Sequence, residues 1–167
     1  MPSTTFTLDT IGAELERVGQ RLGAAVQRGM YGAAERCRQR VVQAIDETKP
    51  HPPVDTGELK RSFKVVPVRG GAVLESGAPH AAHQEFGTRP FTPPFDPIYY
   101  WAQRKLRGAR RARKKGRARE ARQMARRVWR KIRREGITPK RFYARASRDF
   151  DRLTYVALQR ELRRVTA

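Results

Sequence analysis

The chain has few of the residues on which catalytic and cross-linked proteins depend. Its 167 residues include one cysteine, Cys37, three histidines and only 8% aromatic residues. A single cysteine excludes an internal disulfide framework and a cysteine-based zinc site. Because Cys37 falls on the apolar stripe of a predicted helix, we expect it to be a small buried residue.

Acidic residues and long apolar runs are also scarce. There are 16 acidic residues against 37 basic ones, for a formal net charge of +21. No run approaches the roughly 20 apolar residues that a membrane-spanning helix needs. The first residues lack the basic start and apolar core of a secretory signal. We therefore expect a soluble protein made in a reducing cytoplasm, without membrane contact, whose charge favours polyanionic partners such as nucleic acid.

The first quarter of the chain has the periodicity of one long helix. Apolar residues recur every three or four positions over residues 8–48, and Lys49-Pro50 ends the pattern. Such a helix is longer than a small domain needs, so we expect it to lean on neighbours beyond its own subunit. The stripe consists of Ile11, Leu15, Val18, Leu22, Val26, Met30, Ala33, Cys37, Val41 and Ile45.

Residues 55–94 predict a capped helical turn, a β-hairpin and a proline-rich loop. Asp55 precedes Glu58 by three residues, a carboxylate variant of the capping box, which predicts one or two helical turns. The strand-like runs 63–68 and 72–76 are joined by Arg69-Gly70-Gly71, the pattern of a hairpin. The segment 80–86 fits either a strand or a short helix. The prolines from position 90 to position 97 predict an irregular loop that exposes aromatic residues.

Most of the positive charge lies in one segment, within a predicted basic helical insert over 98–136. Residues 104–134 hold 17 basic residues and one acid, whereas the other 136 residues carry 20 basic and 15 acidic residues. Helical spacing of apolar residues in the second half indicates docking on an apolar surface. These residues are Ala121, Met124, Ala125, Val128 and Ile132.

The charge of this insert has two interpretations. A solvated run of like charges is one, and a contact with a polyanion is the other. We favour contact with DNA, or with an acidic ring of a partner protein, because arginine outnumbers lysine and Trp129 is interleaved. No base-reading motif is present, so DNA binding is expected to be non-specific and salt-sensitive. The candidate contacts are Arg110, Arg111, Arg113, Lys114, Lys115, Arg117, Arg119, Arg126, Arg127 and Arg130.

A last helix is predicted over residues 139–165. Thr138 and Pro139 form a cap followed by a proline at the first helical position. Phe142 and Ala146 begin its apolar face. With one long helix, one hairpin and two further helical regions, the chain is expected to be a single α+β domain over 1–167.

Two short motifs suggest chemistry. Asp55-Thr56-Gly57 matches the tripeptide of aspartic proteases, which needs two carboxylates on loops that follow apolar strands. Here it follows His-Pro-Pro-Val and has no second copy, so a helix cap is the preferred interpretation. His80, His83 and Glu85 suggest a metal, but a zinc site needs three or four ligands in secure geometry. Surface or interface roles are preferred, and we expect no enzyme, metal or cofactor.

The order of these elements resembles the head–tail joining (tail-completion, neck or minor tail) proteins of long-tailed phages, the siphophages. In that family a Thr-Gly-x-Leu-x-x-Ser element precedes a hairpin, a Glu-Phe-Gly-Thr element leads into prolines, and a Pro-x-x-Phe-x-x-x-Ala element opens the final helix. The similarity covers about the first 95 residues and resumes near Ile137, so the chain departs from the pattern by an insert of about 40 residues. The matching residues are Thr56, Gly57, Leu59, Ser62, Glu85, Phe86, Gly87, Thr88, Pro139, Phe142 and Ala146.

The resemblance implies a long helix packed across a small antiparallel sheet. Family members form a ring, typically of six subunits, which joins the tail tube to the head-closure and portal rings around the DNA channel. The Thr56–Ser62 element would shape the turn entering the sheet, and the Glu85–Thr88 element the loop leading to the subunit interface. The expected location is the neck of the virion, after assembly in the host cytoplasm. A tail terminator or head-closure ring, and a free nucleic-acid-binding protein, are the alternatives.

Overall fold

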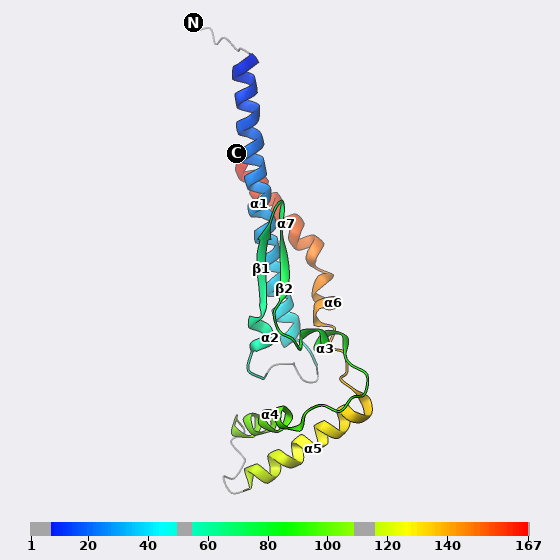
Figure 1. Ribbon diagram of the computed structural model, residues 1–167. Helices are drawn as coiled ribbons and strands as arrows, with labels where there is room; N and C mark the ends of the chain where they lie inside the picture. Colours follow the sequence, from blue (N-terminus) through cyan, green and yellow to red (C-terminus); the bar gives the residue numbers. More distant parts are fainter. Residues whose placement is uncertain (1–7, 50–54, 109–115, 167) are drawn as a thin grey trace. The chain divides into compact units, whose positions relative to one another are not determined.

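The computed structural model describes residues 8–49, 55–108 and 116–166 (Figure 1). Within these ranges the chain forms seven helices and one two-stranded antiparallel sheet, so the α+β prediction is confirmed. The contacts divide it into two compact units. The described parts of 1–43, 63–75 and 145–167 make the first unit, and those of 44–62 and 76–144 make the second. That the chain acts as one domain stays a prediction.

The long N-terminal helix α1 runs over Leu8–Asp46, two residues short of the predicted end. Its last turn closes when the Thr48 hydroxyl donates to the Ala44 carbonyl at 2.9 Å. Cys37 and Val41 are buried on its apolar stripe, as expected, and burial raises the pKa of the Cys37 thiol. The apolar periodicity therefore predicted both the helix and the buried part of its stripe.

A β-hairpin lies against α1 in the first unit (Figure 1). Strands β1 (Phe63–Val68) and β2 (Gly71–Ser76) are joined by a two-residue turn in which Gly70 has φ 75°. The Gln27 amide on α1 donates to the carbonyls of Val68 and Gly71, each at 3.1 Å. These bonds fasten the turn of the hairpin to the helix, in agreement with the predicted packing of helix on sheet.

Helix α7 (Phe150–Thr166) runs antiparallel to α1 in the same unit. Arg40 pairs with Asp149 at 2.7 Å near the start of α7, and Arg28 pairs with Glu161 at 3.2 Å near its end. Between these ion pairs the helices approach closely at Gly29. A Cβ added there would lie 2.9 Å from a methyl carbon of Leu158.

The predicted single C-terminal helix is wrong in its start and in its continuity. Helix α6 begins at Phe142 and ends at Ser147, and α7 begins after an interruption at 148–149. The start is later than Pro139 because the amides of Lys140 and Arg141 donate to the carbonyls of Gln84 and Glu85. Arg141 also has φ 49°, outside the right-handed helical region, so a helix cannot run through this residue.

The second unit contains a helical hairpin formed by α4 (Phe95–Gly108) and α5 (Arg117–Glu135). Ala102 of α4 is fully buried with Ala121 and Ala125 of α5, and small side chains allow the two helices to approach closely. The predicted docking of the basic segment on an apolar surface is thus confirmed, and its partner is α4. Phe95, Ile98, Tyr99, Trp101, Leu106 and Met124 pack around these alanines.

Two short helices complete the second unit. Helix α2 (Glu58–Arg61) precedes the hairpin, and α3 (Ala81–Phe86) resolves the ambiguity of residues 80–86 in favour of a helix. The proline-rich loop ends earlier than predicted, since Pro97 lies in the first turn of α4, where a proline removes no hydrogen bond. In the ranges that the structure describes, no helix has the length and apolarity to span a membrane.

Candidate functional site

The Thr56–Ser62 element forms a tight turn before β1. Leu59 is buried, and the Ser62 hydroxyl donates to the Leu59 carbonyl at 2.7 Å. The Ser62 and Ser76 hydroxyls also hydrogen-bond at 2.8 Å, which joins the start of β1 to the end of β2. Gly57 has φ 76°, a left-handed conformation that favours glycine. Gly57, Leu59 and Ser62 thus each have a role inside the fold.

The predicted capping box at Asp55 is wrong. Gly57 occupies the N-cap position of α2 and no side chain caps this helix, although the Thr56 hydroxyl accepts a long bond from the Glu58 amide at 3.4 Å. The Asp55 carboxylate instead pairs with the Arg104 guanidinium of α4, whose Nε lies 3.0 Å away. This bond raises the pKa of Arg104. No sequence pattern indicated this pair, because Arg104 is 49 residues away.

Glu85 is the buried carboxylate at the centre of the Glu85–Thr88 element. Its Oε2 accepts a hydrogen bond from the Tyr143 amide at 2.8 Å and its Oε1 one from the Ala144 amide at 2.9 Å. Glu85 therefore caps α6, a role expected of Thr138 and Pro139. His80 and His83 are not brought into a metal site with it. Among the described residues no group of three histidine, cysteine or acidic side chains is placed to hold a metal ion.

Gly87 and Thr88 join the two sides of the insert. The Thr88 amide donates to the Ile137 carbonyl, and the Ile137 amide donates to the Thr88 hydroxyl, each at 3.0 Å. Gly87 has φ 74° and ψ −175°, and a Cβ there would lie 2.5 Å from the Ile137 carbonyl oxygen. A Cβ at Gly136 would lie 2.0 Å from the Thr88 carbonyl oxygen. The chain leaves and returns at one point, so close that only glycines fit there.

Two of the three matched residues of the C-terminal element lie near this joint. Phe142 is 1% exposed and is the largest fully buried side chain of the described chain. The Pro139 ring lies beside Gly87, since a Cβ at Gly87 would be 2.9 Å from the proline Cδ. Phe142 therefore packs in the core, whereas Pro139 is exposed and lies against the joint.

Phe86 is the one exposed aromatic residue among the matched residues. Its side chain is 80% exposed, the largest exposure of any large apolar residue in the described chain. Its neighbours in the element, Glu85 and Gly87, are held by α6 and by the Ile137 segment. The backbone around Phe86 is thus fixed while the ring points into solvent.

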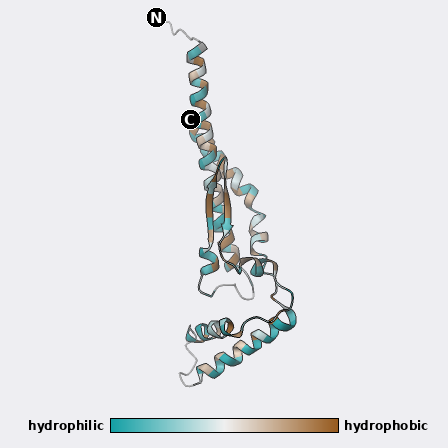
Figure 2. Ribbon diagram, viewed as in Figure 1, coloured by the Kyte–Doolittle hydropathy of each residue, from teal (hydrophilic) through white to brown (hydrophobic). Residues whose placement is uncertain are grey.

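Four of the ten predicted polyanion contacts, Arg119, Arg126, Arg127 and Arg130, lie on one face of helix α5. Its apolar residues face α4, and helical spacing places most of its arginines on the opposite side. Arg117 is half-buried, whereas Arg119, Arg126, Arg127 and Arg130 are exposed. Figure 2 shows hydrophilic colour along most of α5. The candidates Arg110, Arg111, Arg113, Lys114 and Lys115 lie outside the described residues.

Trp129 has a structural bond as well as a cation partner. Its indole N–H donates to the Pro93 carbonyl at 2.8 Å, which ties α5 to the proline-rich loop. The Arg133 guanidinium lies 4.7 Å from the centre of the Trp129 ring. This is a cation–π contact, so the ring already has one cationic partner within its own helix.

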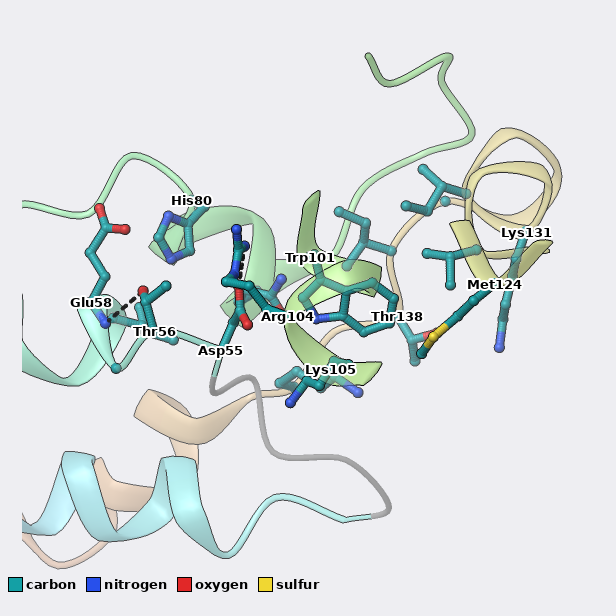
Figure 3. A pocket seen from close by; sticks show the side chains of 18 residues that line it. Asp55, Thr56, Glu58, His80, Trp101, Arg104, Lys105, Met124, Lys131 and Thr138 are labelled. Carbon is teal, nitrogen blue, oxygen red and sulfur yellow. Dashed lines mark hydrogen bonds and ion pairs between the residues drawn. The ribbon is translucent and has the colours of Figure 1, made fainter. Parts of the chain in front are cut away.

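A groove of about 750 Å³ lies within the second unit, bordered by α2, α3, α4, α5 and the segment 136–140 (Figure 3). Figure 3 shows Asp55 and Arg104 facing each other beside Trp101, with Met124 extending from α5. Apolar side chains line much of the groove, and four cations border it. The apolar set is Leu59, Trp101, Met124, Val128, Ile132 and Ile137, and the cations are Arg104, Lys105, Lys131 and Lys140.

No sequence pattern indicated this groove, because segments far apart in the chain, around α2, α3, α4 and α5, build it. An apolar floor with a cationic border suits a partner segment that combines apolar and acidic side chains. Of its two carboxylates, Asp55 and Glu58, Asp55 is engaged by Arg104. Comparisons of the chain with protein-family models, with curated proteins and with solved structures found no match.

Proposed function

We propose that this chain is a virion structural protein that joins a phage tail to the head and portal complex, as a ring around the DNA channel. The observation that carries the proposal is the joint between Thr88 and Ile137. In the resembled family the Glu-Phe-Gly-Thr and Pro-x-x-Phe-x-x-x-Ala elements follow one another rather directly. Here an insert separates them in sequence, yet hydrogen bonds bring them together, as the uninterrupted pattern requires.

The properties of Phe86 support a role in assembly. A large aromatic ring that is 80% exposed on a fixed backbone stabilises nothing within its own chain. Aromatic anchors of this kind are typical centres of protein–protein interfaces. Under the proposal, Phe86 contacts a neighbouring subunit or the adjacent ring, and the hydrogen bonds of Glu85 hold it in place.

The exposed arginines of α5 support a contact with the genome that passes through the ring. In the described part of the chain, Arg119, Arg126 and Arg127 have no acidic partner. Guanidinium groups free of ion pairs can neutralise phosphates without first breaking an existing bond. An acidic ring of a partner protein would use the same chemistry, and a salt titration with DNA distinguishes the two.

A genetic assembly experiment tests the proposal. The gene is disrupted in the phage or prophage that carries it, and lysates are inspected by electron microscopy. We expect DNA-filled heads and complete tails that fail to join, with joining restored when the purified protein is added. Joined particles in normal number would refute the proposal.

The same lysates distinguish the neighbouring roles. Tails of irregular length would point to a tail terminator, because that ring stops tail growth. Heads that lose their DNA would point to a head-closure protein. Unaltered virions, together with a purified protein that binds DNA tightly as a monomer, would favour the free nucleic-acid-binding alternative, for which the net charge of +21 is the argument.

A further inference from the structure

The first part of α1 is a helix without a partner in its own unit. Every residue from 11 to 24 is exposed, over about four helical turns. Figure 1 shows this blue end of α1 extending past the hairpin and α7, which belong to the same unit. A helix that is solvated on all sides gains nothing from packing and is marginal in water. Something outside the described chain is therefore needed to explain its sequence.

That sequence carries an apolar seam of coiled-coil type. Ile11, Leu15, Val18 and Leu22 follow one another at spacings of four, three and four. This alternation assigns Leu15 and Leu22 to heptad position a, and Ile11 and Val18 to position d. Their side chains are 44–67% exposed in the described chain. The next seam position is Ala25, where the helix becomes buried in its own unit.

The residues that flank the seam are complementary to the same helix turned end for end. Glu14 and Arg21 occupy both g positions, and Gly12 and Gly19 occupy both e positions. In an antiparallel pair, g faces g and e faces e. Packing Leu15 against Val18 of the second copy places Glu14 opposite Arg21 and Gly12 opposite Gly19, and each pair occurs twice. A parallel pair would set Glu14 against Gly19 and form no ion pair.

We propose that the occupant of this seam, in the free protein, is a second copy of the chain, bound as a short antiparallel coiled coil over residues 11–22. The contact is isologous, since both copies use the same surface. It has four core layers, formed by Ile11 with Leu22 and by Leu15 with Val18, each twice. The inference goes beyond the proposed function and does not depend on it, because an isologous pair does not build a ring.

Glu14 is available for this contact. Its bond to Arg17, at 2.7 Å, joins two side chains that are 66% and 71% exposed. Exposed ion pairs of this kind contribute little to stability. Glu14 can therefore leave Arg17 and pair with Arg21 of the second copy at little cost in free energy. Arg21 has no acidic partner in the described part of the chain. The single chain does not require glycine at position 12 or 19, because a Cβ there would meet no atom within 4 Å.

The test is the mass of the full chain in solution, measured by sedimentation equilibrium over roughly a hundredfold concentration range. Salt near physiological strength screens the repulsion between two chains of charge +21. We expect the mass to rise towards twice 19.2 kDa. The double variant Leu15→Gln, Val18→Gln is expected to stay monomeric and to keep the melting temperature of the dilute, monomeric wild-type protein, because both side chains are exposed.

Charge exchange tests the orientation. Glu14→Arg and Arg21→Glu, made separately, each place like charges opposite one another twice and should raise the dissociation constant about tenfold. The combined exchange Glu14→Arg, Arg21→Glu restores opposite charges only in the antiparallel register, so it should recover wild-type affinity. A monomer at all concentrations overturns the proposal. So does an oligomer whose affinity is not restored by the combined exchange, which would indicate a parallel or heterologous contact.

Discussion

Glu85 and Tyr143 are joined by a hydrogen bond of 2.8 Å from the backbone amide to the side-chain Oε2, although 58 residues separate them. The other oxygen of the same carboxylate accepts the amide of Ala144. One buried side chain thus caps α6 and holds the chain where the insert returns. The Glu85–Thr88 element is a joint, and this explains why its polar members lie inside the fold while Phe86 lies outside.

Removal of the Glu85 carboxylate should destabilise the protein. In Glu85→Gln one backbone amide faces an NH₂ group in place of a carboxylate oxygen. The free energy of unfolding should therefore fall by about 2 kcal/mol, as expected for the loss of a buried charge-assisted hydrogen bond. Glu75→Gln, at an exposed position on β2, is the matched control and should change little. Urea unfolding followed by circular dichroism measures both. Equal midpoints for the two variants would contradict the capping role.

Substitution of Gly87 should be far more damaging than its positive φ alone requires. Gly70 has φ 75° and Gly87 has φ 74°, but a Cβ at Gly70 meets nothing within 4 Å. Gly70→Ala should therefore cost only the conformational penalty, about 1–2 kcal/mol. Gly87→Ala adds the clash of the new Cβ with the Ile137 carbonyl oxygen. It should therefore lower the melting temperature clearly more than Gly70→Ala does. A smaller loss of stability for Gly87→Ala than for Gly70→Ala would show that the backbone at the joint can shift to accommodate a Cβ.

Phe86 and Phe142 should respond oppositely to truncation. Phe142 is 1% exposed and Phe86 is 80% exposed. Phe142→Ala should lower the free energy of unfolding by about 3–5 kcal/mol, whereas Phe86→Ala should leave it nearly unchanged. When the purified Phe86→Ala variant is added to lysates of the disrupted phage, heads and tails should nevertheless fail to join. Restoration at the wild-type level would mean that Phe86 is not an interface residue.

The ion pair between Arg40 and Asp149 should make part of the stability depend on pH. The hydrogen bond from Arg40 lowers the pKa of Asp149 below its usual value near 3.9. A depressed carboxyl pKa stabilises the fold above that value, and the contribution disappears as pH falls through the folded pKa. The difference in melting temperature between wild type and Asp149→Asn should therefore shrink on acidification. Asp151→Asn, nearby and exposed, controls for removal of a carboxylate.

The arginine face of α5 should govern any binding to DNA. Replacement of Arg126, Arg127 and Arg130 by Gln should reduce the slope of log K against log salt by about 0.9 for each phosphate that is no longer neutralised. The exposed arginines Arg69, Arg148 and Arg160 allow a control with the same change in net charge. Fluorescence anisotropy with a random duplex measures both. Equal reductions of this slope for the two triple variants would indicate that net charge, and no defined face of the protein, governs DNA binding.

Regular elements could be predicted wherever a local pattern was sufficient. The apolar spacing of α1 and α5, and the Arg69-Gly70 turn of the hairpin, depend on neighbours within a few residues. The start of α6 could not be predicted, because it is decided by Glu85 and by the carbonyl of Gln84 from another segment. The cap at Asp55 failed for the same reason, since Arg104 competes for the carboxylate.

Local patterns in the chain were enough to establish the α+β composition, the concentration of charge in one insert, and the motif order that resembles joining proteins. Periodicity and composition are local properties, so they can be read without the fold. Which matched residues are internal and which are exposed became clear only from the packing of distant segments. The same packing buries one stripe of α1 in its second half and leaves it open from Ile11 to Leu22. The reason is physical: an apolar pattern states that a face can be buried, but burial depends on what the folded chain places against it.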